Sequence, residues 1–196
     1  MTLRATAEDV VRRTLAAPAT LGGGRLLCID GPAGSGKTTL SAAVVDAAPP
    51  EVTTALVHLD DVYPGWSGLA EGMDRIARLL VAPLARGAAG GYRRYDWMAG
   101  QEAEWHDVSP ADLLVLEGVG AGSADFAAHI TTLVWVEAPR DVRLARGLER
   151  DIELHGLHED RERLRARWQA WSADEDAMHA RHRTRERADV VVEGLG

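Results

Sequence analysis

The sequence predicts a three-layer α/β/α domain built on a five-stranded parallel sheet, with a helical lid beside it. Three observations carry this prediction: apolar runs of strand length, helical stretches between them, and a glycine-rich segment directly after the first run. Continuous apolar runs are typical of parallel strands buried on both faces. Strands that alternate with helices indicate a parallel sheet covered on both sides. At 196 residues, we expect one domain over 1–196, with the lid at about 140–172.

The predicted elements follow in chain order. The first is an amphipathic helix over 6–17, where Thr6 and Asp9 form a capping-box pattern. The apolar runs predict strands over 25–30, 52–59, 112–116, 132–136 and 188–192. The predicted helices lie over 37–47, 70–86 and 140–187, the last with breaks near Gly156 and Ser172. The stretch 88–110 shows no regular pattern.

Composition and charge limit the class of protein. Hydrophobic content of 46% and charged content of 27% are typical of a globular protein. No apolar run is long enough to span a membrane, and the N-terminal residues do not resemble a secretory signal. Cys28 is the single cysteine, which excludes an internal disulfide; we expect it buried, in a protein of the reducing cytoplasm. The net charge of −8 argues against a nucleic-acid partner.

The most specific motif is GPAGSGKTT, residues 31–39, which follows the first predicted strand. It matches the phosphate-binding loop pattern, and its Lys37 is the only lysine beside 21 arginines. A slim ammonium can lie along such a loop and reach the β/γ-phosphates. We therefore predict ATP as cofactor, although no signature separates ATP from GTP. The predicted nucleotide-binding residues are Gly31, Ala33, Gly34, Ser35, Gly36, Lys37, Thr38 and Thr39, with the Thr38 hydroxyl on Mg²⁺.

Two carboxylates, Asp60 and Asp61, follow the second predicted strand in HLDDVYP. Ligands bind at the carboxyl edge of an open α/β sheet. A carboxylate there can accept the proton of an acceptor hydroxyl during phosphoryl transfer, or hold Mg²⁺ through water. Asp60 is preferred because it is nearer the strand end. The alternative is a turn with solvated acids, since Pro64 and Gly65 favour turns.

Glu117 ends the third apolar strand at the same edge, which predicts a Mg²⁺ partner beside Thr38. The alternative for Glu117 is a helix-capping or solvated carboxylate. Farther along, Arg143, Arg146 and Arg150 share one helical face and can clamp transferring phosphates. The alternative for these arginines is surface pairing with the acids around them.

Aromatic side chains flank the predicted acceptor site. Tyr63, Trp66, Tyr95 and Trp97 lie in loop-like stretches and can stack on a ring of the acceptor. Trp168 and Trp171, three residues apart, are instead predicted to pack a helix, and Trp135 to lie in the core.

In their order, GPAGSGKTTL, HLDDVY, RRYDW, LLVLEG and RLARGLERD resemble the uridine kinase-like branch of the P-loop nucleoside and small-metabolite kinases. The resemblance implies a P-loop NTPase fold, Asp60 as catalytic base, and Thr38 with Glu117 as Mg²⁺ partners. It also implies lid arginines at 143, 146 and 150, and it leaves room for a homo-oligomer, as in related kinases. The resemblance and the positions of five residues along the chain together mark them as acceptor-site residues: Asp61, Tyr63, Tyr95, Asp96 and Trp97.

The chain departs from uridine-cytidine kinases at several positions. Gly147 replaces the second member of an arginine pair in the lid, and His155 and Leu157 stand where further lid arginines are expected. Gly100 stands where those enzymes carry a base-reading histidine. The phosphoryl-transfer residues are thus kept and the pyrimidine-reading ones are not, so uridine is not the predicted acceptor.

The sequence therefore predicts a Mg-ATP-dependent kinase acting on a hydroxyl of a small metabolite, such as a nucleoside. One alternative is an ATP-binding regulatory or hydrolase module without a small acceptor. Another is a nucleoside monophosphate kinase, for which arginines are available at 75, 78, 93 and 94. Nucleic-acid binding through the arginine-rich C-terminal half is disfavoured by the interleaved acids of HEDRERLRAR.

Overall fold

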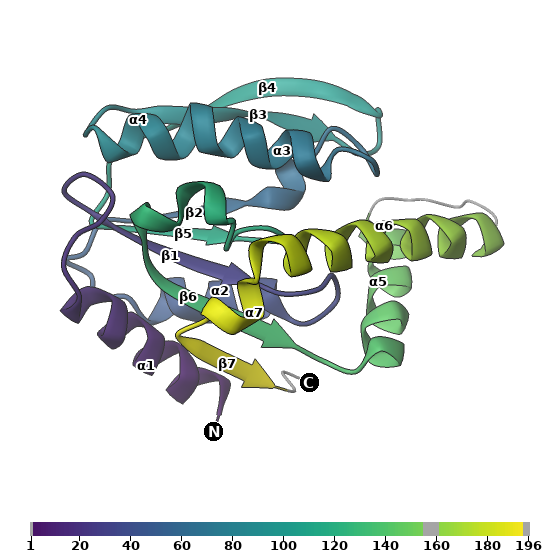
Figure 1. The fold of residues 1–196 in the computed structure, drawn as a ribbon, viewed down its shortest axis with the longest axis horizontal. Helices are drawn as coiled ribbons and strands as arrows, with labels where there is room; N and C mark the ends of the chain where they lie inside the picture. Colours follow the sequence, from purple (N-terminus) through teal and green to yellow (C-terminus); the bar gives the residue numbers. More distant parts are fainter. Residues whose placement is uncertain (1, 155–160, 194–196) are drawn as a thin grey trace.

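The computed structural model describes residues 2–154 and 161–193, excluding the side chains at 150, 152–154 and 161. A five-stranded sheet with the order β2-β5-β1-β6-β7 forms its centre, and every neighbouring pair of strands is parallel (Figure 1). The predicted α/β fold is therefore confirmed. The strands are β1 (Arg25–Asp30), β2 (Thr54–His58), β5 (Leu113–Glu117), β6 (Ile130–Glu137) and β7 (Val190–Glu193).

The two faces of the sheet carry separate hydrophobic cores. Alternate residues of β1 point to opposite sides, so that Leu27 and Ile29 pack with α1 (Leu3–Ala16) and α2 (Lys37–Ala47). Leu26 and Cys28 join the other core, with α3 (Leu69–Arg75) and the elements that follow it. Cys28 is fully buried, as predicted. This arrangement gives the three predicted layers.

The predicted helix over 70–86 is a run of three joined helical segments. These are α3, the π-helical segment η2 (Ile76–Val81) and α4 (Ala82–Ala85). Gly87 follows with a φ of 74°, a left-handed conformation that favours glycine and ends the helix. The first predicted helix begins earlier than expected: Thr2 caps α1 by accepting the N–H of Ala5 at 3.3 Å. The predicted capping box at Thr6 is therefore wrong.

The stretch 88–110 is an antiparallel hairpin, which the sequence did not predict. Its strands are β3 (Gly90–Asp96) and β4 (Gln101–Val108), and it packs outside the helical layer (Figure 1). Exposed residues dominate β4, and neither strand carries the apolar run that marked the others. Gly91 lies beneath the indole of Trp105, where a Cβ would come within 2.6 Å of the ring.

Three helices lie in the C-terminal part of the chain, and the first two overlap the predicted lid region of about 140–172. They are α5 (Arg140–Leu154), α6 (Arg161–His182) and the short α7 (Thr184–Arg187). Ser172 lies inside α6, so the predicted break there is wrong, and the break predicted near Gly156 lies outside the described residues. In Figure 1, α5 and α6 stand beyond the carboxyl ends of the strands. Within the described residues, no helix combines the length and apolar character needed to cross a bilayer.

Candidate active site

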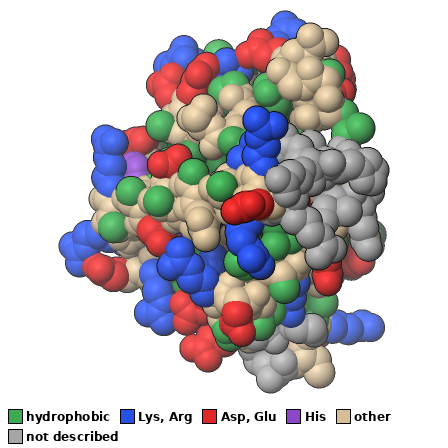
Figure 2. All heavy atoms as spheres, turned by 90° about the vertical axis from the view of Figure 1, so that its right-hand side faces the viewer, with side chains coloured by type: hydrophobic (Ala, Val, Ile, Leu, Met, Phe, Trp, Pro, Cys, Tyr) green, Lys and Arg blue, Asp and Glu red, His purple; other side chains and the backbone are tan. Residues whose placement is uncertain are grey.

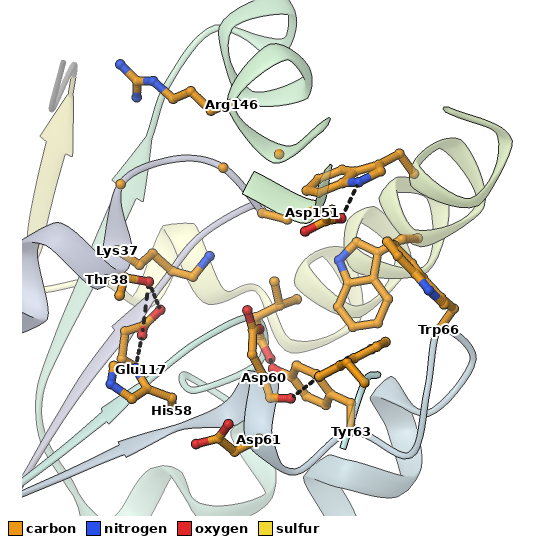
Figure 3. Close-up of a pocket in the computed structure, with 18 of the residues that line it drawn as sticks. Lys37, Thr38, His58, Asp60, Asp61, Tyr63, Trp66, Glu117, Arg146 and Asp151 are labelled. Atoms are coloured by element: carbon orange, nitrogen blue, oxygen red, sulfur yellow. Dashed lines mark hydrogen bonds and ion pairs between the residues drawn. The ribbon is translucent and has the colours of Figure 1, made fainter. Parts of the chain in front are cut away.

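A cavity of about 480 Å³ opens at the carboxyl ends of β2 and β5, where the sequence placed the site. One side is the glycine-rich loop with the start of α2; the other is formed by η1 (Leu59–Asp61) and the lid (Figure 3). The predicted site residues that line it are Ala33, Gly34, Gly36, Lys37, Thr38, Thr39, Asp60, Asp61, Tyr63, Trp97, Glu117 and Arg146. It is also lined by His58, Trp66, Val119, Gly147, Asp151, Trp168 and Trp171.

The glycine-rich loop joins β1 to α2. Gly34 and Gly36 have φ values of 76° and 101°, which turn the loop backbone inward. The Lys37 ammonium donates to the carbonyl of Pro32 at 3.0 Å, and Figure 3 shows it pointing into the cavity. Gly31 and Ser35 do not line the cavity, and Ser35 is fully buried. The loop and the N-terminus of α2 can together surround phosphate oxygens with N–H groups.

Asp30 anchors the base of this loop, a role that sequence reasoning missed. Its buried carboxylate accepts the N–H groups of Gly31 at 2.6 Å and of Gly120 and Gly122 at 2.9 Å. His179 of α6 lies 3.0 Å from the same carboxylate. Burial would raise the pKa of Asp30, but His179 and the N–H donors outweigh it and hold the pKa below its ordinary value.

A buried carboxylate of the lid holds the loop from behind. Glu175 of α6 accepts two hydrogen bonds, one from the N–H of Ala33 at 2.8 Å and one from the guanidinium of Arg143 at 3.1 Å. Arg143 also donates to the carbonyl of Ala138 at 3.2 Å. Arg143 thus sits behind the loop and does not line the cavity, in contrast to the predicted phosphate clamp.

The other two predicted lid arginines differ in position. Arg146 lines the cavity, yet Figure 3 shows its guanidinium extending away from Lys37 and Asp60. The side chain of Arg150 lies outside the described part of the structure. Among the described side chains, Arg146 is therefore the one of these three arginines that lines the cavity.

Thr38, Glu117 and His58 form a polar cluster at the floor of the cavity. The Thr38 hydroxyl lies 3.3 Å and 3.4 Å from the two Glu117 carboxylate oxygens. His58 Nδ1 lies 2.6 Å from Glu117 Oε2, and this hydrogen bond raises the pKa of His58. A hydroxyl and a carboxylate are hard oxygen donors of the kind that Mg²⁺ prefers, so the residues present fit that ion. His58 was not among the predicted residues; its place at the end of β2 was the available signal.

Asp60 and Asp61 follow β2 on η1. Figure 3 shows the Asp60 carboxylate at the centre of the cavity, across from Lys37. Trp97 Nε1 donates to the backbone carbonyl of Asp60 at 2.8 Å and so ties the hairpin to this segment. Asp61 lies lower, on the His58 side, and burial raises the pKa of its carboxyl.

The predicted acceptor-site aromatics separate into two groups. Tyr63 lines the cavity with its ring, but it is fully buried and its hydroxyl donates to the carbonyl of Val119 at 2.6 Å. Tyr95 packs edge-on against Trp97, with ring centres 5.2 Å apart, and does not line the cavity. Asp96 accepts the N–H groups of Met98 and Ala99 and shapes the hairpin turn, away from the cavity.

Two tryptophans predicted only to pack a helix also line the cavity. Trp168 and Trp171 are both buried in α6 and both face the site. Trp168 Nε1 donates to Asp151 of α5 at 2.8 Å. Trp135 is buried in β6 as predicted, 4.7 Å from the ring of His179.

The parallel sheet, the glycine-rich loop at its edge and the helices beyond it define a P-loop kinase fold. More specifically, the chain belongs to the phosphoribulokinase / uridine kinase family, whose model matches residues 70–196. The predicted family is confirmed at this level, and the chain is a kinase-family protein of the kind that phosphorylates small metabolites. Among curated proteins, no sequence matches this chain significantly.

Solved structures with the same fold cover nearly the whole chain. A possible uridine kinase from Bacillus stearothermophilus is 21% identical with a TM-score of 0.67, covering 98% of this chain and 100% of its own. A protein from Silicibacter sp. TM1040 proposed to be a fructose transport system kinase is 23% identical with a TM-score of 0.68, at 97% and 98% coverage. D-glycerate 3-kinase from Cryptococcus neoformans is 11% identical with a TM-score of 0.60, at 98% and 96% coverage. These likenesses concern the fold.

Proposed function

We propose that the protein transfers the γ-phosphoryl group of ATP to a hydroxyl of a small metabolite, with Mg²⁺ as the metal. The observation that carries the proposal is the placement of Asp60 across the cavity from Lys37 and from the Thr38–Glu117 pair (Figure 3). In this proposal, a side that can hold phosphates faces a carboxylate that can accept a proton. The space between them has room for an acceptor.

Each residue has a role in this proposal. The loop N–H groups and Lys37 hold the β- and γ-phosphates, and Thr38 with Glu117 holds the metal. Bound there, Mg²⁺ would neutralise charge on the phosphates. Asp60 accepts the hydroxyl proton as that oxygen attacks the γ-phosphorus, and the bond to the β-bridging oxygen breaks to leave ADP. Arg146 and Arg150 remain proposed lid cations, whereas Arg143 is proposed to position the loop.

A nucleoside monophosphate kinase is less consistent with the geometry. It would need arginines on the acceptor side to bind the acceptor phosphate. The four that the sequence offered are engaged on the outer helix and hairpin and do not line the cavity: Arg75, Arg78, Arg93 and Arg94. Acidic and basic side chains are interspersed on the face in Figure 2, which favours a small-molecule partner over nucleic acid.

The test is ADP release from Mg-ATP with a panel of nucleosides, nucleoside monophosphates, vitamins and sugars. Asp60→Asn should retain nucleotide binding and lose most turnover with the stimulating acceptor. Asp46→Asn, at an exposed position of α2, is the matched control and should behave like the unchanged protein. Steady hydrolysis that no acceptor stimulates would favour the ATP-binding regulatory module instead.

A further inference from the structure

We propose that the acceptor carries a positively charged nitrogen group, such as an alkylated ammonium, beside the hydroxyl that receives the phosphoryl group. This inference rests on the proposed function, because it names the substrate class of the same cavity. Three features carry it: the indoles around Trp66, the carboxylates that line the acceptor side, and the positions of the cationic side chains.

Four indoles line the acceptor side of the cavity, and Trp66 lies at their centre. Its ring centre is 5.7 Å from that of Trp97, 6.1 Å from Trp168 and 6.2 Å from Trp171. Trp66 comes from the loop after η1, Trp97 from the hairpin, and the other two from α6. Three separate parts of the chain therefore contribute indoles to one side of the cavity. If Trp168 and Trp171 served only to pack α6, Trp66 and Trp97 would not need to lie beside them.

The angles between these rings favour a rounded cation over a flat neutral ring. Trp66 meets Trp97 at 75°, Trp168 at 70° and Trp171 at 88°. Near-perpendicular rings form concave corners bounded by π-faces, the arrangement by which aromatic cages bind ammonium groups. A heteroaromatic ring held between two indoles would instead need two parallel faces with a gap between them, and none of the three angles provides that.

In the described part of the structure, the charged side chains on the acceptor side have the matching sign. Asp60, Asp61 and Asp151 line the cavity, and Asp151 also accepts the indole N–H of Trp168. Among the described residues, two Lys or Arg side chains line the cavity, Lys37 and Arg146. Figure 3 shows Lys37 on the loop side and Arg146 extending away from the indoles. A cation at the indoles would thus meet carboxylates and π-faces in a partly desolvated site.

The test uses alcohol pairs that share a shape and differ in charge. The first pair is choline and its neutral carbon analogue 3,3-dimethylbutan-1-ol; the second is 1-(2-hydroxyethyl)pyridinium and 2-phenylethanol. ADP release from Mg-ATP gives kcat/KM for each alcohol. Quenching of tryptophan fluorescence, with a β,γ-methylene analogue of ATP present, gives Kd without turnover. We expect the cation of at least one pair to be favoured by about tenfold or more in both readouts.

Two variants show whether the cavity is responsible for the preference. Trp66→Leu should weaken binding of the cation and reduce its advantage toward unity. Asp151→Asn keeps an oxygen for Trp168 Nε1 and removes the charge, so it should lower kcat/KM and affinity for the cation more than for the neutral analogue. Trp105→Leu, on the outer hairpin and outside the cavity, is the matched control and should leave the preference intact.

The outcomes separate this inference from the proposed function. Phosphoryl transfer that is equal or faster to the neutral member of each pair overturns the cationic acceptor and leaves the kinase proposal standing. Binding of the cation with no transfer to any alcohol supports the acceptor class and overturns the transfer. A preference for the cation that survives Trp66→Leu overturns the aromatic site. Absence of both binding and transfer for all four alcohols overturns the inference, while the wider acceptor panel continues to test the kinase.

Discussion

Gly147 of α5 and Trp168 of α6 are in direct contact, and a Cβ at position 147 would overlap the benzene ring of Trp168. This contact gives a physical reason for a departure seen in the sequence, where glycine replaces one arginine of the lid pair. Trp168 fills the space that a side chain at 147 would take. At this point of the cavity wall, the indole of Trp168 lies where a side chain at 147 would lie.

We expect Gly147→Ala to disturb this contact despite the higher helix propensity of alanine. Overpacking a fitted site costs about 1–3 kcal/mol, more than the roughly 1 kcal/mol that alanine contributes in a helix. The displaced Trp168 should raise the KM for the acceptor more than the KM for ATP. Ala145→Ser, at an exposed position of α5, is the control for helix effects. An unchanged acceptor KM and melting temperature would show that the contact is not restrictive.

The second prediction concerns the bond between Glu175 and the N–H of Ala33. Glu175→Ala should destabilise the fold by about 3 kcal/mol. The substitution removes the buried carboxylate that accepts hydrogen bonds from the Arg143 guanidinium and from the Ala33 N–H. Burial raises the pKa of Glu175, so the neutral Glu175→Gln should cost less. Urea unfolding measures both variants. Asp174→Ala, exposed on the same helix, is the control, and an equal loss there would contradict the prediction.

The third prediction concerns the orientation of Glu117. The 2.6 Å contact with His58 fixes one carboxylate oxygen, and partners of this kind typically change metal affinity by about 10–100-fold. His58→Ala should therefore raise the Mg²⁺ concentration needed for half-maximal ADP release by at least about tenfold. A titration with Mg²⁺ at fixed ATP measures it. His106→Ala, outside the cavity, is the control, and the same Mg²⁺ dependence in both variants would argue against the role of His58.

The sheet and the loop could be predicted from sequence because their signals are local. The run LLCI in β1 is apolar since both faces of that strand are covered, and GPAGSGKTT carries its own pattern. The hairpin could not be predicted in this way. Strand β4 is largely exposed, and cross-strand pairs such as Arg94 with Glu104 hold the two strands together, so neither strand has an apolar run.

The residues that tie the site together could not be predicted for a different reason. Asp30, Glu175 and His179 are single polar residues whose partners lie far away in sequence, such as Glu175 with Ala33. Helix spacing placed Arg143 on a plausible face but could not show that α5 packs this part of it behind the loop. Such contacts depend on how helices pack on the sheet, which local patterns do not specify.

The last prediction is a pH effect on stability at the end of β6. Glu137 accepts two hydrogen bonds from the guanidinium of Arg185, a residue of α7, at 2.8 Å and 2.9 Å. It accepts a third from the indole N–H of Trp135 at 2.8 Å. The hydrogen bond from Arg185 lowers the pKa of Glu137 to about 2, below its ordinary value of 4.5. The carboxylate is therefore more favourable in the folded than in the unfolded chain. Its contribution is present above about pH 4.5 and is lost as the pH falls toward 2.

Because Arg185 is largely exposed, solvent weakens this pair, and we expect a contribution of about 0.5–1 kcal/mol. Arg185→Gln should remove it, so the variant should be less stable than the unchanged protein at pH 7 and should approach it in acid. Urea unfolding between pH 7 and the lowest pH at which the chain stays folded measures the difference. Arg183→Gln is the control, because this guanidinium pairs with Glu186 three residues away. A stability difference for Arg185→Gln that does not shrink as the pH falls would mean that the guanidinium acts through packing on β6 instead of through the Glu137 charge.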